Sequence, residues 1–67
     1  MRYTIELDRE EDGRHIAEII EIPGVMAYGA TEQEATDKVI ALALRLLAEQ
    51  IEHGETTLAR NEALCFA

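Results

Sequence analysis

The chain has 67 residues and a formal net charge of −8, from 14 acidic and 6 basic side chains. This length allows a single domain, residues 1–67, and a domain so small is only marginally stable unless it is cross-linked, metal-bound or oligomeric. Cys65 is the only cysteine, which excludes an internal disulfide and a metal site built on several thiolates. Self-association is therefore the expected source of additional stability.

The negative charge also narrows the class of partner. An acidic surface repels nucleic-acid phosphates and anionic membranes, so we expect neither direct DNA binding nor membrane binding. It attracts basic proteins and speeds their encounter. No stretch approaches the ~20 apolar residues of a transmembrane helix, and the N-terminus has no signal-peptide pattern. Together with the single free cysteine, these features predict a cytoplasmic protein.

Three strands are predicted in the first half of the chain. Residues 2–7 alternate between apolar and polar side chains, which is typical of a half-buried strand. Residues 8–13 are polar and end in an Asp-Gly pair, so they predict a hairpin turn. A second strand is expected over 15–22, with apolar residues on both faces, and the Pro-Gly pair at 23–24 ends it. Residues 25–28 predict a short third strand.

A long helix follows, and its start is marked by a capping box over 31–34. The Thr31 hydroxyl is expected to accept a hydrogen bond from the backbone N–H of Glu34, while the Glu34 carboxylate reaches back to Thr31. The helix should run to about His53, with Gly54 as its C-terminal stop. At about 33 Å it is longer than the about 23 Å of a seven-residue strand, so its last turns should extend past the sheet.

This helix carries two apolar stripes, and one small sheet can cover only one of them. The other must meet a second copy, a different protein or the C-terminal tail, and we predict that it mediates self-association. The first stripe consists of Ala35, Val39, Leu42 and Leu46, and the predicted self-association stripe consists of Ile40, Leu44, Leu47 and Ile51.

The predicted fold is therefore α+β, a small antiparallel β-β-β-α sheet with one long helix packed on it. Its core spans about residues 1–54, and 55–67 form a C-terminal tail in which 63–66 either make a short last strand or pack onto the exposed stripe. The sequence has no serine, and it has no glycine-rich phosphate loop.

Neither histidine nor the cysteine has a suitable partner in sequence, so His15, His53 and Cys65 are interpreted as structural. The acidic loop 8–13 superficially resembles a calcium-binding loop, but Ile19 stands where a bidentate glutamate is needed. We expect no catalytic residue, no cofactor and no metal site, and hence no enzyme. A buried cluster of carboxylates with perturbed pKa values in a cleft would favour the opposite view.

The order of these features resembles the HicB-like antitoxin family. An N-terminal hairpin leads to a Glu-Ile-Pro-Gly-Val segment, and a Tyr-Gly-Ala-Thr segment then opens the long helix. The resemblance covers roughly residues 1–54. The matching residues are Glu21, Ile22, Pro23, Gly24, Gly29, Thr31, Glu34 and Ala35, whereas Val25 and Ala30 depart from the usual pattern.

The resemblance implies a degraded ribonuclease-H-like fold without catalytic residues, with a β-β-β-α core and a further strand. It implies dimers or tetramers, and a role in neutralising a small, basic, mRNA-cleaving toxin of the HicA type. Many such antitoxins carry a C-terminal DNA-binding module, but the 13 residues after Gly54 are too few for one.

Two functions follow as expectations. In the first, the protein is a HicB-like antitoxin that occludes its toxin, steered by the acidic hairpin loop and the acidic edge of the helix. In the second, it is an orphan HicB-like module that oligomerises or binds another protein and has no toxin partner. The loop residues predicted to steer the partner are Asp8, Glu10, Glu11 and Asp12.

Overall fold

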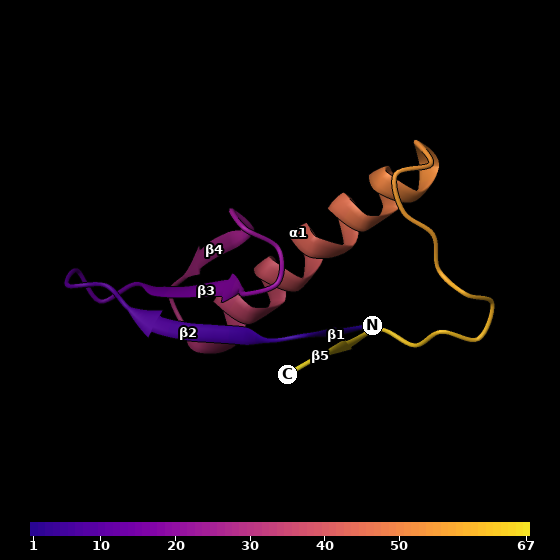
Figure 1. Ribbon diagram of the computed structural model, residues 1–67. Coiled ribbons are helices and arrows are strands. Elements are labelled where there is room, and N and C mark those ends of the chain that lie inside the picture. The colour runs from indigo at the N-terminus through magenta and orange to yellow at the C-terminus, as the bar shows by residue number, and fades with distance from the viewer.

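Three antiparallel strands and one helix make up most of the chain in the computed structural model, which describes all residues from 1 to 67 (Figure 1). The predicted β-β-β-α order is confirmed, and a short last strand is present. In chain order the elements are β1 (Arg2–Tyr3), β2 (Ile5–Arg9), β3 (His15–Ile19), β4 (Met26–Gly29), α1 (Glu32–Glu52) and β5 (Cys65–Phe66).

The main sheet has the order β2-β3-β4, and both neighbouring pairs are antiparallel. Gly13, with φ of 94°, closes the hairpin between β2 and β3 as its Asp-Gly sequence predicted. The predicted second strand is too long, because β3 ends at Ile19 and residues 20–24 turn sharply. The Ile22 N–H donates back to the Ile19 carbonyl at 3.2 Å, and Gly24 takes a positive φ of 85°.

The predicted first strand is interrupted at Thr4, where the side chain of Glu21 takes the place of a neighbouring strand. The Thr4 N–H donates to Oε1 of Glu21 and the Thr4 hydroxyl donates to Oε2, both at 2.7 Å. The Thr4 carbonyl accepts from the Ile20 N–H at 3.1 Å. The backbone N–H of Thr4, followed by its hydroxyl, holds the pKa of Glu21 below its ordinary value of 4.5.

Replacing Glu21 with glutamine is expected to lower the melting temperature near pH 7 and to flatten its decline in acid. A carboxylate whose pKa is depressed by folding adds stability above its unfolded pKa, and this stability is lost as the pH falls through the folded pKa. Thermal melts between pH 7 and pH 3 measure the difference. Glu55→Gln, at an exposed residue without side-chain hydrogen bonds, is the control. An unchanged pH profile in Glu21→Gln would contradict this role for the Thr4 contacts.

The last strand, β5, pairs in parallel with β1, which settles the alternative left open for the C-terminal residues. The Cys65 N–H donates to the Met1 carbonyl at 2.9 Å, and the Ile5 N–H donates to the Ala67 carbonyl at 2.8 Å. The rings of Tyr3 and Phe66 stack with centroids 5.2 Å apart. The tail therefore adds a strand beside the N-terminal residues instead of covering the helix (Figure 1).

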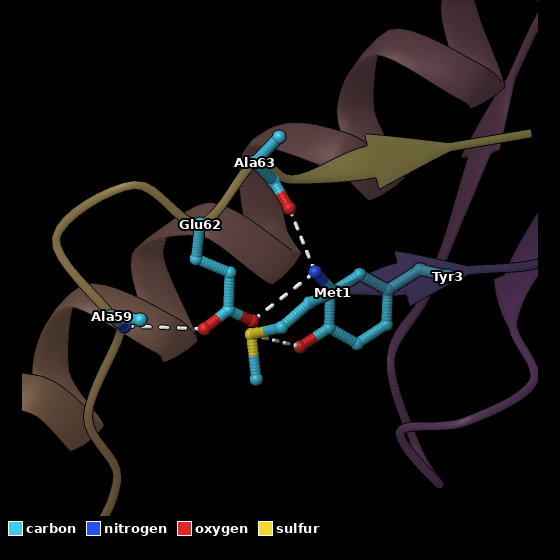
Figure 2. Close-up of polar contacts among 5 residues, drawn as sticks. All are labelled: Met1, Tyr3, Ala59, Glu62 and Ala63. Carbon is cyan, nitrogen blue, oxygen red and sulfur yellow. Dashed lines mark hydrogen bonds and ion pairs between the residues drawn. The ribbon is translucent and has the colours of Figure 1, made fainter.

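A group of polar contacts around Met1 fastens the loop before β5 (Figure 2). The Met1 ammonium donates to the Ala63 carbonyl at 2.7 Å and pairs with Oε2 of Glu62 at 3.1 Å. The other Glu62 oxygen accepts from the Ala59 N–H at 3.2 Å, and this bond is the main reason why the pKa of Glu62 is lowered. The Tyr3 hydroxyl lies 3.5 Å from the Met1 sulfur.

The helix begins and ends at the residues that the sequence indicates. The Thr31 hydroxyl accepts from the Glu34 N–H at 3.0 Å, as the capping box predicted. The Glu34 carboxylate instead binds the Lys38 ammonium at 2.9 Å, one helical turn further on. His53 caps the C-terminal end, and Gly54 follows with φ of 71°.

The helix α1 packs mainly against β3 and β4, on one face of the sheet (Figure 1). Its last turns extend past the strands, as its length predicted, and the longest dimension of the protein is 41 Å. No helix is long and apolar enough to span a bilayer. The core consists of Tyr3, Ala17, Ile19, Val25, Ala35, Val39, Ala43 and Leu47.

Candidate interaction surfaces

The four acidic residues predicted to steer a partner are all exposed, Asp8 in β2 and the other three in the loop between β2 and β3. Asp12 is already occupied, because its carboxylate accepts from the Arg14 N–H at 3.0 Å and from Arg14 Nε at 2.7 Å. These contacts lower the pKa of Asp12, the backbone N–H of Arg14 being the largest cause. The side chains of Glu10 and Glu11 have no hydrogen-bond or ion-pair partner, so they are free to face another molecule.

Arg14 connects this loop to the sheet face that α1 leaves uncovered. Its guanidinium carbon lies 4.4 Å from the centre of the Tyr28 ring, a distance typical of a cation–π contact. Asp8, at the end of β2, accepts a hydrogen bond from the Arg9 N–H at 2.8 Å. Asp8 pairs across the sheet with Ile16 on β3, which in turn pairs with Tyr28 on β4. The acidic loop and the uncovered face are therefore one continuous surface.

We call this uncovered side of the β2-β3-β4 sheet the open face. The strand register places every second residue on it, because side chains alternate between the two faces. Ala17 and Ile19, on the opposite face, are fully buried beneath α1, whereas Ile20, Met26 and Tyr28 remain 47%, 41% and 40% exposed. The open face comprises the acidic Glu6, Asp8 and Glu18 and the apolar Ile16, Met26 and Tyr28. Ile20 directly follows β3 and extends this face by one residue, because its N–H still donates to the Thr4 carbonyl.

Two glutamates occupy directly opposite positions on this face. Glu6 and Glu18 are cross-strand partners in the register of β2 and β3. Neither side chain takes part in any of the three ion pairs of the protein. Like charges at directly opposed positions repel and destabilise a sheet.

Glu18→Gln should therefore stabilise the protein although it removes a charged residue. Loss of the repulsion from Glu6 is expected to add about 0.5 kcal/mol to the free energy of unfolding, or roughly 2–4 °C in melting temperature. Thermal melts at low and high salt test this, since salt screens the repulsion and should reduce the difference. A lower melting temperature for Glu18→Gln would show that the carboxylate is not under repulsion.

The predicted self-association stripe is only partly exposed. Leu47 is 5% exposed and belongs to the core, while Ile40 is half-buried. Leu44 and Ile51 remain 42% and 39% exposed. The buried ridge follows the spacing i, i+4 through Ala35, Val39, Ala43 and Leu47. Of the first predicted stripe, Ala35 and Val39 are buried, and Leu42 and Leu46 are half-buried and pack against the core.

The exposed apolar surface of α1 includes two alanines that the sequence reasoning did not count. Ala41 and Ala48 are exposed with Leu44 and Ile51, at alternating spacings of three and four residues. This spacing is that of a two-helix seam. We call these four residues the helix stripe. The position of α1 explains the error: Ala17, Ala35 and Ala43 are fully buried, and their small side chains let helix and sheet approach closely.

The one hollow in the surface is shallow, and it lies beside the N-terminal end of α1. It is lined by Leu7, Asp8, Arg9, His15 and Glu32. Leu7 points to the helix side of the sheet but stays 41% exposed, because α1 lies over β3 and β4. Histidine, cysteine and acidic side chains nowhere gather in threes that could hold a metal ion. His53 caps the helix, and Cys65 is exposed in β5.

A comparison with known proteins finds a relative in an archaeon. The chain is 29% identical over 63 residues to UPF0150 protein Ta0767 of Thermoplasma acidophilum. The aligned region covers 94% of this chain and 90% of the relative. No family model matches the chain, and no solved structure does either. The chain is thus similar to a UPF0150 protein over nearly the whole length of both.

Proposed function

We propose that this protein is a HicB-like antitoxin of the cytoplasm, which binds a small basic mRNA-cleaving toxin of the HicA type and neutralises it by occlusion. The proposal is supported by the residues on which the resemblance rests. Glu21 joins the turn after β3 to Thr4, Gly24 forms that turn, and Thr31 caps the helix. These residues stabilise the fold, so the resemblance predicts the fold of the family. The surface that binds a partner has to be found among the exposed residues.

The observation that carries the proposal is the distribution of charge. Twelve of the 14 acidic side chains are exposed, and those of Glu18 and Glu62 are half-buried. With a net charge of −8, such a surface attracts a protein that binds RNA through basic residues and competes with RNA for them. Covering the RNA-binding surface of a toxin stops cleavage without any chemical step, so this function requires binding and no catalysis.

The test is to purify this chain together with the short basic protein encoded by a neighbouring reading frame, and to measure RNA cleavage by that protein with and without it. Stable binding with loss of cleavage supports the antitoxin function. Full cleavage in the presence of a stoichiometric excess of this chain overturns it. The affinity should fall as salt rises, because charge attraction drives the encounter.

The second candidate is an orphan HicB-like oligomerisation module, and the exposed helix stripe favours it. Leu44 and Ile51 are exposed and do not belong to the core, so another copy can cover them without disturbing it. Sedimentation of the chain alone distinguishes the candidates when combined with the binding assay. A stable oligomer that binds no basic protein from the same locus supports the orphan module.

A further inference from the structure

The side chains of the open face change from acidic on β2 to apolar on β4. In one row of cross-strand partners, Glu6 on β2 and Glu18 on β3 are followed by Met26 on β4. The next row begins with Asp8 on β2 and ends with Tyr28 on β4. The acidic side chains thus lie toward β2, and the exposed apolar ones lie toward β4. A partner that fits this face must bring positive charge to one side and an apolar surface to the other.

We propose that the open face is the surface that binds a basic protein partner, and that a lysine or arginine of this partner binds between Glu6 and Glu18. An apolar side chain of the partner packs against Met26 and Ile20. The inference deepens the proposed antitoxin function and rests on it, because it assigns the toxin to one face of the sheet. Glu6 and Glu18 repel each other in the free protein, and a bound cation would turn this repulsion into attraction.

Charge explains why this face suits a basic partner better than a second copy. Two copies joined through their open faces would bring Glu6, Asp8 and Glu18 of one copy near the same residues of the other, and like charges across an interface oppose association. Nucleic acid would be repelled in the same way. The helix stripe, on a different side of the protein, leaves self-association available at the same time.

The experiment measures the affinity of the basic neighbouring protein for the wild type and for variants with matched exposure. Met26→Glu should weaken binding at least about tenfold, since loss of one well-packed interface anchor has this effect. Leu7→Glu changes a side chain of the same exposed fraction, 41%, on the opposite side of the sheet, and should change the affinity less than about twofold.

Glu18→Gln gives a second readout, in which binding and stability move in opposite directions. We expect this variant to melt higher than the wild type and yet to bind the basic protein several-fold more weakly. A side chain with a purely structural role would move both quantities the same way. Its affinity should also depend less on salt, because one charge has left the interface.

The outcomes separate this inference from the function on which it rests. If the wild type does not bind the basic protein, the antitoxin proposal fails and the inference fails with it. If the wild type binds and Met26→Glu and Glu18→Gln bind equally well, the partner lies elsewhere and only the inference is overturned. Dissociation of the homo-oligomer by Met26→Glu, with toxin binding intact, would assign the open face to self-association and would also overturn it.

Discussion

Gly29→Ala is expected to lower the free energy of unfolding by about 3 kcal/mol, roughly 12–24 °C in melting temperature. Gly29 ends β4, and a Cβ atom built there would lie 2.4 Å from the Ala35 nitrogen and 2.9 Å from the carbonyl carbon of Glu34. Both are backbone atoms in the first turn of α1, so no side chain can rotate away. The helix must move off the sheet, and the buried contacts of Ala35 and Val39 would be loosened.

The matched control is Gly54→Ala, which separates close packing from backbone conformation. Gly54 has a φ of 71° and nothing within 4 Å of the added Cβ, so its replacement meets only the left-handed conformational penalty, about 1 kcal/mol. Gly29 has no positive φ. Chemical denaturation of both variants measures the difference. A loss at Gly29 no larger than the loss at Gly54 would show that α1 shifts freely on the sheet.

Gly29 illustrates which parts of the fold the sequence predicts and which it does not. The sequence places a strand end and a helix start around it, because a glycine before a capping threonine is a local pattern. The need for a hydrogen atom in place of a Cβ depends on how closely α1 approaches β4. That distance is set by the whole core, so no pattern in residues 28–31 could indicate it.

The same division between local and tertiary causes holds elsewhere in the chain. The turns at Gly13 and Gly24 and the helix stop at Gly54 were predicted, and all three residues have positive φ. The binding of the Glu21 carboxylate to Thr4 joins residues 17 positions apart, and sequence periodicity carries no information about it. Glu34 was expected to reach back to Thr31, but a lysine one turn away attracts it instead.

The assignment of the helix stripes was incomplete for a related reason. The helix stripes were assigned from the helical period, and Ala43 was left out of both. The small side chains of Ala17 and Ala27 in the sheet allow the helix to lie close. The buried ridge of the helix then passes through Ala43. The only indication of the open face in the sequence was that the second predicted strand has apolar residues on both of its faces. The exposure of Ile20 and Tyr28 depends on the absence of a second layer there.

Leu47→Asp is expected to unfold most of the protein, whereas Leu44→Asp should leave it folded. Leu47 is 5% exposed, and its loss removes a buried apolar side chain and places a carboxylate in the core. The combined cost is at least about 4 kcal/mol. A single core in a chain of this length rarely supplies more than about 3–5 kcal/mol of stability. Far-UV circular dichroism at 25 °C should therefore show little helix for this variant.

Leu44, three residues earlier, tests self-association without this cost, because its side chain is 42% exposed. If the helix stripe joins two copies, Leu44→Asp should sediment as a folded monomer of 7.5 kDa while the wild type sediments as an oligomer. Part of the stability of the wild type should then depend on concentration, and that dependence should vanish in the variant. A folded wild-type monomer at micromolar concentration would show that α1 needs no partner. An oligomer that survives Leu44→Asp would instead place the interface outside the helix stripe.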